Sequence, residues 1–183
     1  MQPRYSHIHQ ALHWITALFL FTILPLAWVM THAKHGAPYV SDLINWHRTL
    51  GLLVLAITLF RIVWRLIDKP PPYPQGVAVW DRGLAHATYW IFLLALVWMP
   101  VTGYLMTSFG GHGVKFFDII EAPSPLAPDK AMDHLFDTLH DAGQWAIYAL
   151  IALHLGAVVL HTIWGRDGVL GRMLPRSATE LGE

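Results

Sequence analysis

The sequence contains no cysteine, and that absence alone excludes several classes of site. Without thiols the chain forms no disulfide, no thiolate metal site, no iron–sulfur cluster on its own cysteines and no cysteine nucleophile. Charge is also scarce, because Lys, Arg, Asp and Glu make up 13% of the 183 residues and the formal net charge is +0. This balance gives no indication of a nucleic-acid partner. Any metal or cofactor must be held by other side chains.

Apolar residues and histidine are abundant instead. Hydrophobic residues reach 55% of the chain, which is typical of a membrane protein. The 12 histidines equal the 12 lysines and arginines in number, which is an unusual ratio. Histidine is the commonest metal ligand and a usual axial ligand of b-type haem. Histidine is therefore the main chemical signal in this sequence.

Four stretches are long and apolar enough to cross a bilayer, whose hydrocarbon core needs about 20 helical residues. They cover residues 12–31, 46–67, 84–107 and 140–163. We therefore predict an all-α, integral membrane four-helix bundle in which residues 1–183 form one domain. The first stretch is long for the apolar part of a signal peptide and three more spans follow it, so we expect it to be retained.

The positive charges predict the orientation of the bundle, since cytoplasmic loops carry an excess of Lys and Arg. The N-terminus, the 61–83 segment and the tail hold Arg4, Arg61, Arg65, Lys69, Arg82, Arg166, Arg172 and Arg176. The opposite side holds Lys34, Arg48, Lys115 and Lys130. This excess predicts that both termini are cytoplasmic and that loop 108–139 lies outside.

Histidines lie inside the apolar spans, where an ionisable group is costly and is a functional candidate by default. His140 and His154 are 14 residues apart, which gives a rise of about 21 Å on nearly one helix face. They are too far apart to bind one metal ion, so each needs a partner from another helix. His47 opens the second span at the depth of His140, and His13 opens the first span on the side of His154. Two bis-histidine sites follow, each suited to an iron porphyrin.

The spacing leaves the partner of His13 open. His161 lies about 10 Å beyond His154 on the same helix, and His86 begins the third span from the same side. Each of these three histidines is therefore a possible partner of His13 at this stage.

Residues beside the outer pair also suit a large planar cofactor. Gly51 follows His47 by one turn and Gly143 lies near His140, and each leaves room for a macrocycle. Arg48 is expected to pair with a haem propionate at the outer edge.

Long segments of the chain resemble the bacterial cytochrome b561 proteins, which belong with the membrane cytochrome b subunits of hydrogenases and formate dehydrogenases. The segments are "RYSHIHQALHW" (4–14), "WHRTLGLLVLAITLFRIVWRL" (46–66), "GLAHATYWIFLLALVWMPVTGYLM" (83–106) and "LHDAGQWAIYALIALHLGAVVLHTIWGRDGVLGRMLP" (139–175). The resemblance runs nearly end to end, and the tail RDGVLGRMLP is especially diagnostic. It implies a multi-pass cytochrome of the bacterial inner (plasma) membrane with two b-type haems, which passes electrons between an outer donor and the quinone pool.

The resemblance also implies roles for individual residues. His47 and His140 are expected to ligate the outer haem iron, and His13 and His154 the inner one. His161 and His86 are then left without an iron, and each is a candidate either for binding a quinone or for a structural hydrogen bond. Members of the family have been linked to the oxidation of superoxide with transfer of the electron to ubiquinone, which implies an oxidoreductase.

Three functions remain open. The first is transmembrane electron transfer to the quinone pool, with superoxide:ubiquinone oxidoreductase activity as its enzymatic form. The second is a haem-bearing anchor or relay subunit for a soluble dehydrogenase or a small cytochrome. The third is a histidine-lined transporter for a metal or protons, although the spans contain almost no Asp or Glu away from their ends.

The charge of the outer loop bears on the first two. Loop 108–139 carries Lys115 and Lys130 against five carboxylates. That pattern opposes the steering of an anion such as superoxide and suits a basic redox partner protein on the outer face.

Overall fold

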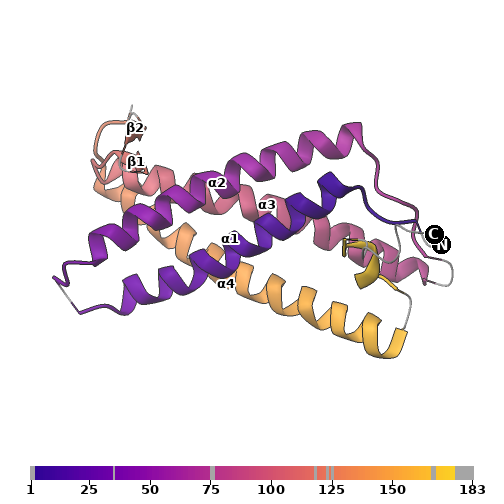
Figure 1. Ribbon diagram of the computed structural model, residues 1–183. Coiled ribbons are helices and arrows are strands. Elements are labelled where there is room, and N and C mark those ends of the chain that lie inside the picture. The colour runs from indigo at the N-terminus through magenta and orange to yellow at the C-terminus, as the bar shows by residue number, and fades with distance from the viewer. Residues whose placement is uncertain are drawn as a thin grey trace.

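The computed structural model describes residues 3–34, 36–74, 77–117, 119–122, 124, 126–165 and 168–175. The elements in chain order are α1 (His7–His32), α2 (Val40–Ile67), α3 (Val79–Phe109), β1 (Val114–Phe116), β2 (Ile120–Ala122), α4 (Lys130–Leu160), the π-helical turn η1 (His161–Gly165) and the 3₁₀ turn η2 (Leu170–Arg172). Figure 1 shows an elongated bundle with the β1–β2 hairpin at one end and η2 toward the other. We call these the hairpin end and the terminal end.

All four long helices have the length and apolar composition needed to cross a membrane. Large apolar side chains point outward, and Leu18 and Leu153 are 63% and 68% exposed. Such exposure suits lipid, which is as apolar as leucine itself. The predicted all-α architecture with four spans is confirmed.

The helices begin earlier than the apolar stretches predict. α1 starts at His7 and α4 at Lys130, five and ten residues before the predicted spans. Ser6 and Asp129 cap these two helices by accepting backbone N–H groups of the first turn. Hydropathy marks only the lipid-facing part of a helix, whereas the caps determine where its backbone begins.

Two of the arginines that supported the predicted orientation lie inside a membrane helix. Arg61 and Arg65 belong to α2, which ends at Ile67, where the predicted 46–67 span also ends. Arg166 and Arg176, which also supported the predicted orientation, lie outside the described residues.

The helices pack in sequence, with α1 against α2, α2 against α3 and α3 against α4. Val54, Leu96 and Ile147, one from each of the last three long helices, form the centre of the apolar core. In the described part of the chain α4 approaches α1 and α2 much less closely than it approaches α3. α4 therefore does not pack closely along the α1–α2 pair.

A set of hydrogen bonds, here called the terminal clasp, joins the two ends of the chain. Arg172 is 6% exposed, and its guanidinium donates from Nε to the Pro3 carbonyl at 2.9 Å and from Nη2 to the Pro72 carbonyl at 2.7 Å. Tyr5 N donates to the Arg172 carbonyl at 3.2 Å. Trp14 Nε1 donates to the carbonyl of the next residue, Met173, at 2.8 Å. The segment 168–175 therefore lies against the start of α1.

The hairpin covers the other end of α2. β1 and β2 pair antiparallel, with Val114 opposite Ala122 and Phe116 opposite Ile120. Phe117 N donates to Thr49 Oγ1 at 3.1 Å, and Val114 is 3% exposed. The hairpin is thus fixed to α2 close to His47.

Candidate functional site

The four histidines singled out in the spans form two facing pairs. The ring centroids of His47 and His140 are 6.1 Å apart, and those of His13 and His154 are also 6.1 Å apart. Each pair joins α4 to a helix that it does not pack against closely, α2 in the first case and α1 in the second.

This separation fits a metal ion between two imidazoles. Metal–imidazole bonds are about 2 Å long, and a ring centre lies about 1 Å beyond the bonded nitrogen, so two rings on opposite sides of an ion have centroids roughly 6 Å apart. The structure therefore brings together the residues of both predicted pairs at a distance that suits axial ligation of an iron porphyrin.

The His140 ring is held by the backbone of α3. His140 Nδ1 lies 3.0 Å from the Met99 carbonyl oxygen and 3.1 Å from Thr102 Oγ1. A carbonyl only accepts hydrogen bonds, so Nδ1 carries the ring proton and donates it to Met99. Nε2 is then left with a free lone pair, which is the state a metal ligand requires.

Gly103 makes room for this ring. A Cβ built on Gly103 would lie 3.0 Å from His140 Cε1 and 3.3 Å from Nδ1. Gly103 was not among the predicted site residues, although a glycine inside an apolar helix commonly marks a close approach.

A cavity of about 310 Å³ adjoins the His47–His140 pair. Cofactor and ligand sites usually occupy about 300–1,000 Å³. Gly51 lines the cavity, and the nearest atom to a Cβ built on it is Ile23 Cδ1 at 4.0 Å, so its bare backbone faces open space. His47 Nδ1 is buried without a hydrogen-bond partner in the described part of the chain. An orphaned buried nitrogen beside open space is consistent with a site that a bound group completes.

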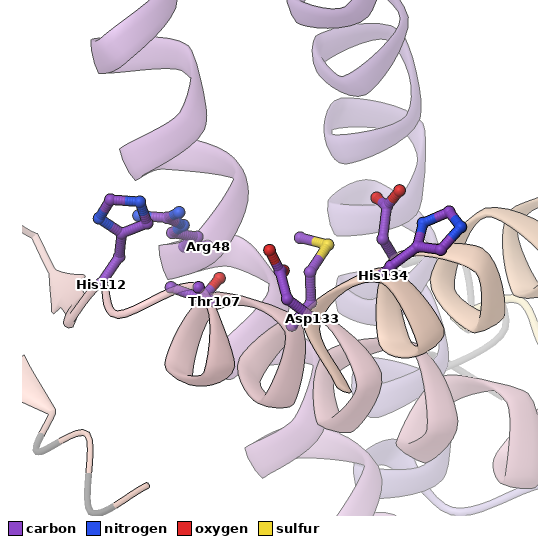
Figure 2. Close-up of a pocket in the computed structure, with 8 residues that line it drawn as sticks. Arg48, Thr107, His112, Asp133 and His134 are labelled. Carbon is purple, nitrogen blue, oxygen red and sulfur yellow. The ribbon is translucent and has the colours of Figure 1, made fainter. Parts of the chain in front are cut away.

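Arg48 borders this cavity and a second, polar pocket of about 330 Å³ at the hairpin end. Figure 2 shows Arg48 with Thr107, His112, Asp133 and His134 around the second pocket. A guanidinium between a cofactor-sized cavity and a polar pocket is well placed to bind a carboxylate at the edge of a cofactor.

Gly143 lies at a helix contact. A Cβ built on it would lie 2.5 Å from Met99 Sδ and 3.2 Å from Trp98 Cδ1, both on α3. Its small size permits α3 and α4 to approach each other, and a role beside a macrocycle stays a prediction.

Aromatic rings surround the His13–His154 pair. The Trp14 ring meets His13 edge-on at 5.2 Å, and the Phe92 ring meets His154 edge-on at 5.7 Å. These rings give the second pair an apolar wall.

The remaining two candidates have partners elsewhere. His161 Nε2 lies 3.6 Å from Asp81 Oδ1 at the start of α3. His86 Nε2 accepts a hydrogen bond of 3.1 Å from Trp90 Nε1, one turn along the same helix. These contacts favour the structural interpretation of both histidines, and their predicted role at a quinone stays untested.

Comparison with known proteins identifies the family. The family model described as prokaryotic cytochrome b561 matches residues 4–176. Cytochrome b561 homolog 2 of Escherichia coli K12 is 26% identical over 180 residues, which cover 98% of this chain and 95% of that protein. A probable superoxide oxidase, CybB of Yersinia pestis, is 28% identical over 181 residues, or 96% of this chain and 98% of that protein. Cytochrome b561 homolog 1 of Escherichia coli K12 is 27% identical over 179 residues, with coverages of 94% and 98%.

The family model thus covers nearly the whole chain, including all four helices and both histidine pairs. Its members are membrane electron carriers, and the family implies b-type haem. The chain therefore belongs to the prokaryotic cytochrome b561 family.

Proposed function

We propose that this chain is a dihaem cytochrome b that transfers electrons between a donor at the hairpin end and the quinone pool. Two histidine pairs with the same 6.1 Å separation are the observation that carries the proposal. His47 and His140 hold one haem b, and His13 and His154 hold the other. When bound, the two haems supply reversible one-electron chemistry.

The protein's own residues set the conditions for this chemistry. The hydrogen bond from His140 Nδ1 to the Met99 carbonyl orients the ring and directs Nε2 away from α3. Arg48 offers a cation to a propionate at the edge of the same cavity. With two histidines to hold each haem, the bound iron would be available for outer-sphere electron transfer and not for oxygen binding.

The orientation of the chain follows from its charges. Eight Lys and Arg lie in the N-terminus, the 61–83 segment and the C-terminal tail of the sequence, against Lys34, Arg48, Lys115 and Lys130 on the opposite side. The positive-inside rule then puts both termini in the cytoplasm and the hairpin on the outer face. A quinone site at the cytoplasmic end, near His161 or His86, completes the proposed electron path.

Superoxide is one candidate donor, since a relative of nearly equal length is named a probable superoxide oxidase. The alternative is an anchor or relay subunit that receives electrons from a basic protein. The carboxylates of the hairpin-end pocket, among them Asp133, favour this alternative. The two are separated by reducing the purified protein with either a superoxide-generating system or a basic soluble cytochrome at rising salt. Only the protein donor is expected to slow steeply as salt screens the carboxylates.

The ligand assignment is tested by single substitutions. His140→Ala is expected to remove the hairpin-end haem and leave the other, and His154→Ala is expected to do the reverse. Haem content and reduced-minus-oxidised spectra of the detergent-purified variants measure this, with His86→Ala as the control that keeps both haems. A folded variant in which His140→Ala or His154→Ala removes both haems, or neither, contradicts the pairing.

A further inference from the structure

Arg61 is a cation inside a membrane helix, and the described residues give it no anionic partner. It lies in α2, six residues before the helix ends, which is about 9 Å from that end. Its Nη1 donates a hydrogen bond to Thr16 Oγ1 at 3.3 Å, and Arg61 makes no ion pair with any residue in the described ranges. A charged side chain at this depth is expensive unless it is paired.

Nearby carboxylates do not supply the missing charge. α1 contains no Asp or Glu, and the one acidic residue of α2, Asp42, lies 19 residues away near the other end of the helix, or about 28 Å. Asp81 of α3 lies against His161, and Asp68, just beyond the end of α2, lies against His9. These contacts leave Arg61 without a carboxylate partner among the described residues.

The depth of Arg61 matches that of the His13–His154 pair. His47 faces His140, and both α2 and α4 run from the hairpin end toward the terminal end. Arg61 follows His47 by 14 residues and His154 follows His140 by the same number, so each lies about 21 Å further along its helix. Fourteen residues also return nearly to the same helix face.

The contact with Thr16 gives the same level independently. Thr16 follows His13 by three residues on α1, is 3% exposed, and donates its own hydroxyl hydrogen to the Leu12 carbonyl at 2.6 Å. Its oxygen is thereby free to accept from Arg61, which holds the guanidinium within one helical turn of His13.

Arg65, one turn further along α2, is in a different situation. Its guanidinium carbon lies 4.0 Å from the ring centroid of Tyr89 and 5.9 Å from that of Trp90. Arg65 is thus stabilised by aromatic faces, and the same residue type on the same helix provides a matched control.

We propose that Arg61 binds a carboxylate of the group held by His13 and His154, that is, a propionate of the terminal-end haem. This inference rests on the proposed function and adds to it a specific anion-binding residue. A guanidinium forms two parallel hydrogen bonds with a carboxylate, and its cation stabilises the extra negative charge that reduction brings to the site.

The test uses the full-length protein with haem carrying ¹³C at the propionate carboxyls. Arg61→Gln and Arg65→Gln are compared with the wild type by potentiometric titration and by redox-difference infrared spectroscopy. The titration wave lost in His154→Ala identifies the terminal-end haem. In Arg61→Gln the reduction equilibrium of that haem is expected to become at least tenfold less favourable, which is about 59 mV for one electron. Its ¹³C-carboxylate bands are expected to shift, while Arg65→Gln changes neither quantity.

Other outcomes overturn the inference. They are an Arg61→Gln protein whose reduction equilibrium constant for that haem stays within twofold of the wild-type value, unmoved ¹³C bands, or equal band shifts in Arg65→Gln. Unmoved bands with weaker binding of an anionic lipid would assign Arg61 to a lipid phosphate instead.

Arg61→Lys is used if Arg61→Gln cannot hold the terminal-end haem. The haem content of the wild type distinguishes a failure of this inference from a failure of the proposed function. Arg61→Lys retains the positive charge, so it is expected to keep the terminal-end haem even if Arg61→Gln loses it. Its ¹³C-carboxylate bands are expected to shift. Unmoved bands in Arg61→Lys would refute the contact between Arg61 and the propionate. A wild type with fewer than two haems refutes the proposed function itself. A wild type with two haems, together with an Arg61→Gln protein whose potential and ¹³C bands are unchanged, refutes only this inference.

Discussion

Replacing Gly103 by alanine is expected to weaken the hairpin-end haem site selectively. The added methyl group would lie 3.0 Å from His140 Cε1 and 3.3 Å from Nδ1. Comfortable contacts between carbon atoms are about 3.5–4.0 Å. The ring must therefore retreat by about 0.5 Å or more. Its Nδ1 is tied to the Met99 carbonyl at 3.0 Å, and a displacement of this size lengthens that hydrogen bond toward the limit of about 3.5 Å.

The energetic cost follows from the crowding. Overpacking by one methyl group costs about 1–3 kcal/mol. Because 1.4 kcal/mol corresponds to a tenfold change in an equilibrium constant, the haem at this site should bind roughly 5- to 150-fold more weakly. The second pair does not touch Gly103, so its haem should be unaffected.

Haem transfer from the purified variant to an excess of an apo-haem protein measures the effect, with the two haems followed by their difference spectra. Gly156→Ala is the matched control, because a Cβ at Gly156 meets no atom within 4 Å although it lies two residues after His154. If Gly103→Ala kept both haems as firmly as the wild type, or if Gly156→Ala lost as much, the proposed support of His140 by α3 would be refuted.

Two further predictions concern the terminal end. Arg172→Ala removes two charge-assisted hydrogen bonds, of 2.9 and 2.7 Å, each of which stabilises the fold by about 1.5–3 kcal/mol. Because the freed carbonyls regain water, we expect the free energy of unfolding to fall by about 3 kcal/mol. Thermal unfolding in detergent measures this loss of stability. The control is Arg82→Ala, which breaks one exposed hydrogen bond to the Val77 carbonyl, and an equal loss of stability in the two variants contradicts the prediction. The pKa of Asp68 lies below its ordinary value because Ser6 donates to the carboxylate, with His9 adding to the effect. The stability that the ionised Asp68 contributes is present above the pKa of an unfolded aspartate, about 3.9, and is lost as the pH falls through the lower pKa of Asp68 in the folded protein. Asp68→Asn should therefore flatten the fall in unfolding temperature below about pH 4, and an unchanged acid limb contradicts this.

Local patterns in the sequence predicted much of the site. Apolar stretches of about 20 residues gave the four helices, and the fixed rise of an α-helix placed His47 level with His140. The pairing of His13 was open on spacing alone, and the structure brings it to His154. Helical periodicity determines depth and face, so residues on neighbouring helices can be matched without knowledge of the packing.

Features that depend on contacts between distant segments were not predictable in this way. Gly103 matters because α4 crosses α3 there, and Gly143 faces α3 for the same reason. The terminal clasp joins Arg172 to Pro3, which are 169 residues apart, and no local pattern reports such a contact. Arg61 was counted as an orientation signal although it lies in the predicted span 46–67, because only the packing of the helices shows which groups lie beside it.

The central claim is that each of the two histidine pairs holds one haem. Its most direct test is the haem content per chain of the detergent-purified protein, from a pyridine haemochrome assay together with a reduced-minus-oxidised optical spectrum. The account predicts two b-type haems per chain. A colourless protein would contradict the electron-transfer account and leave the paired histidines to a transport or structural role, and a single haem would contradict the assignment of two sites.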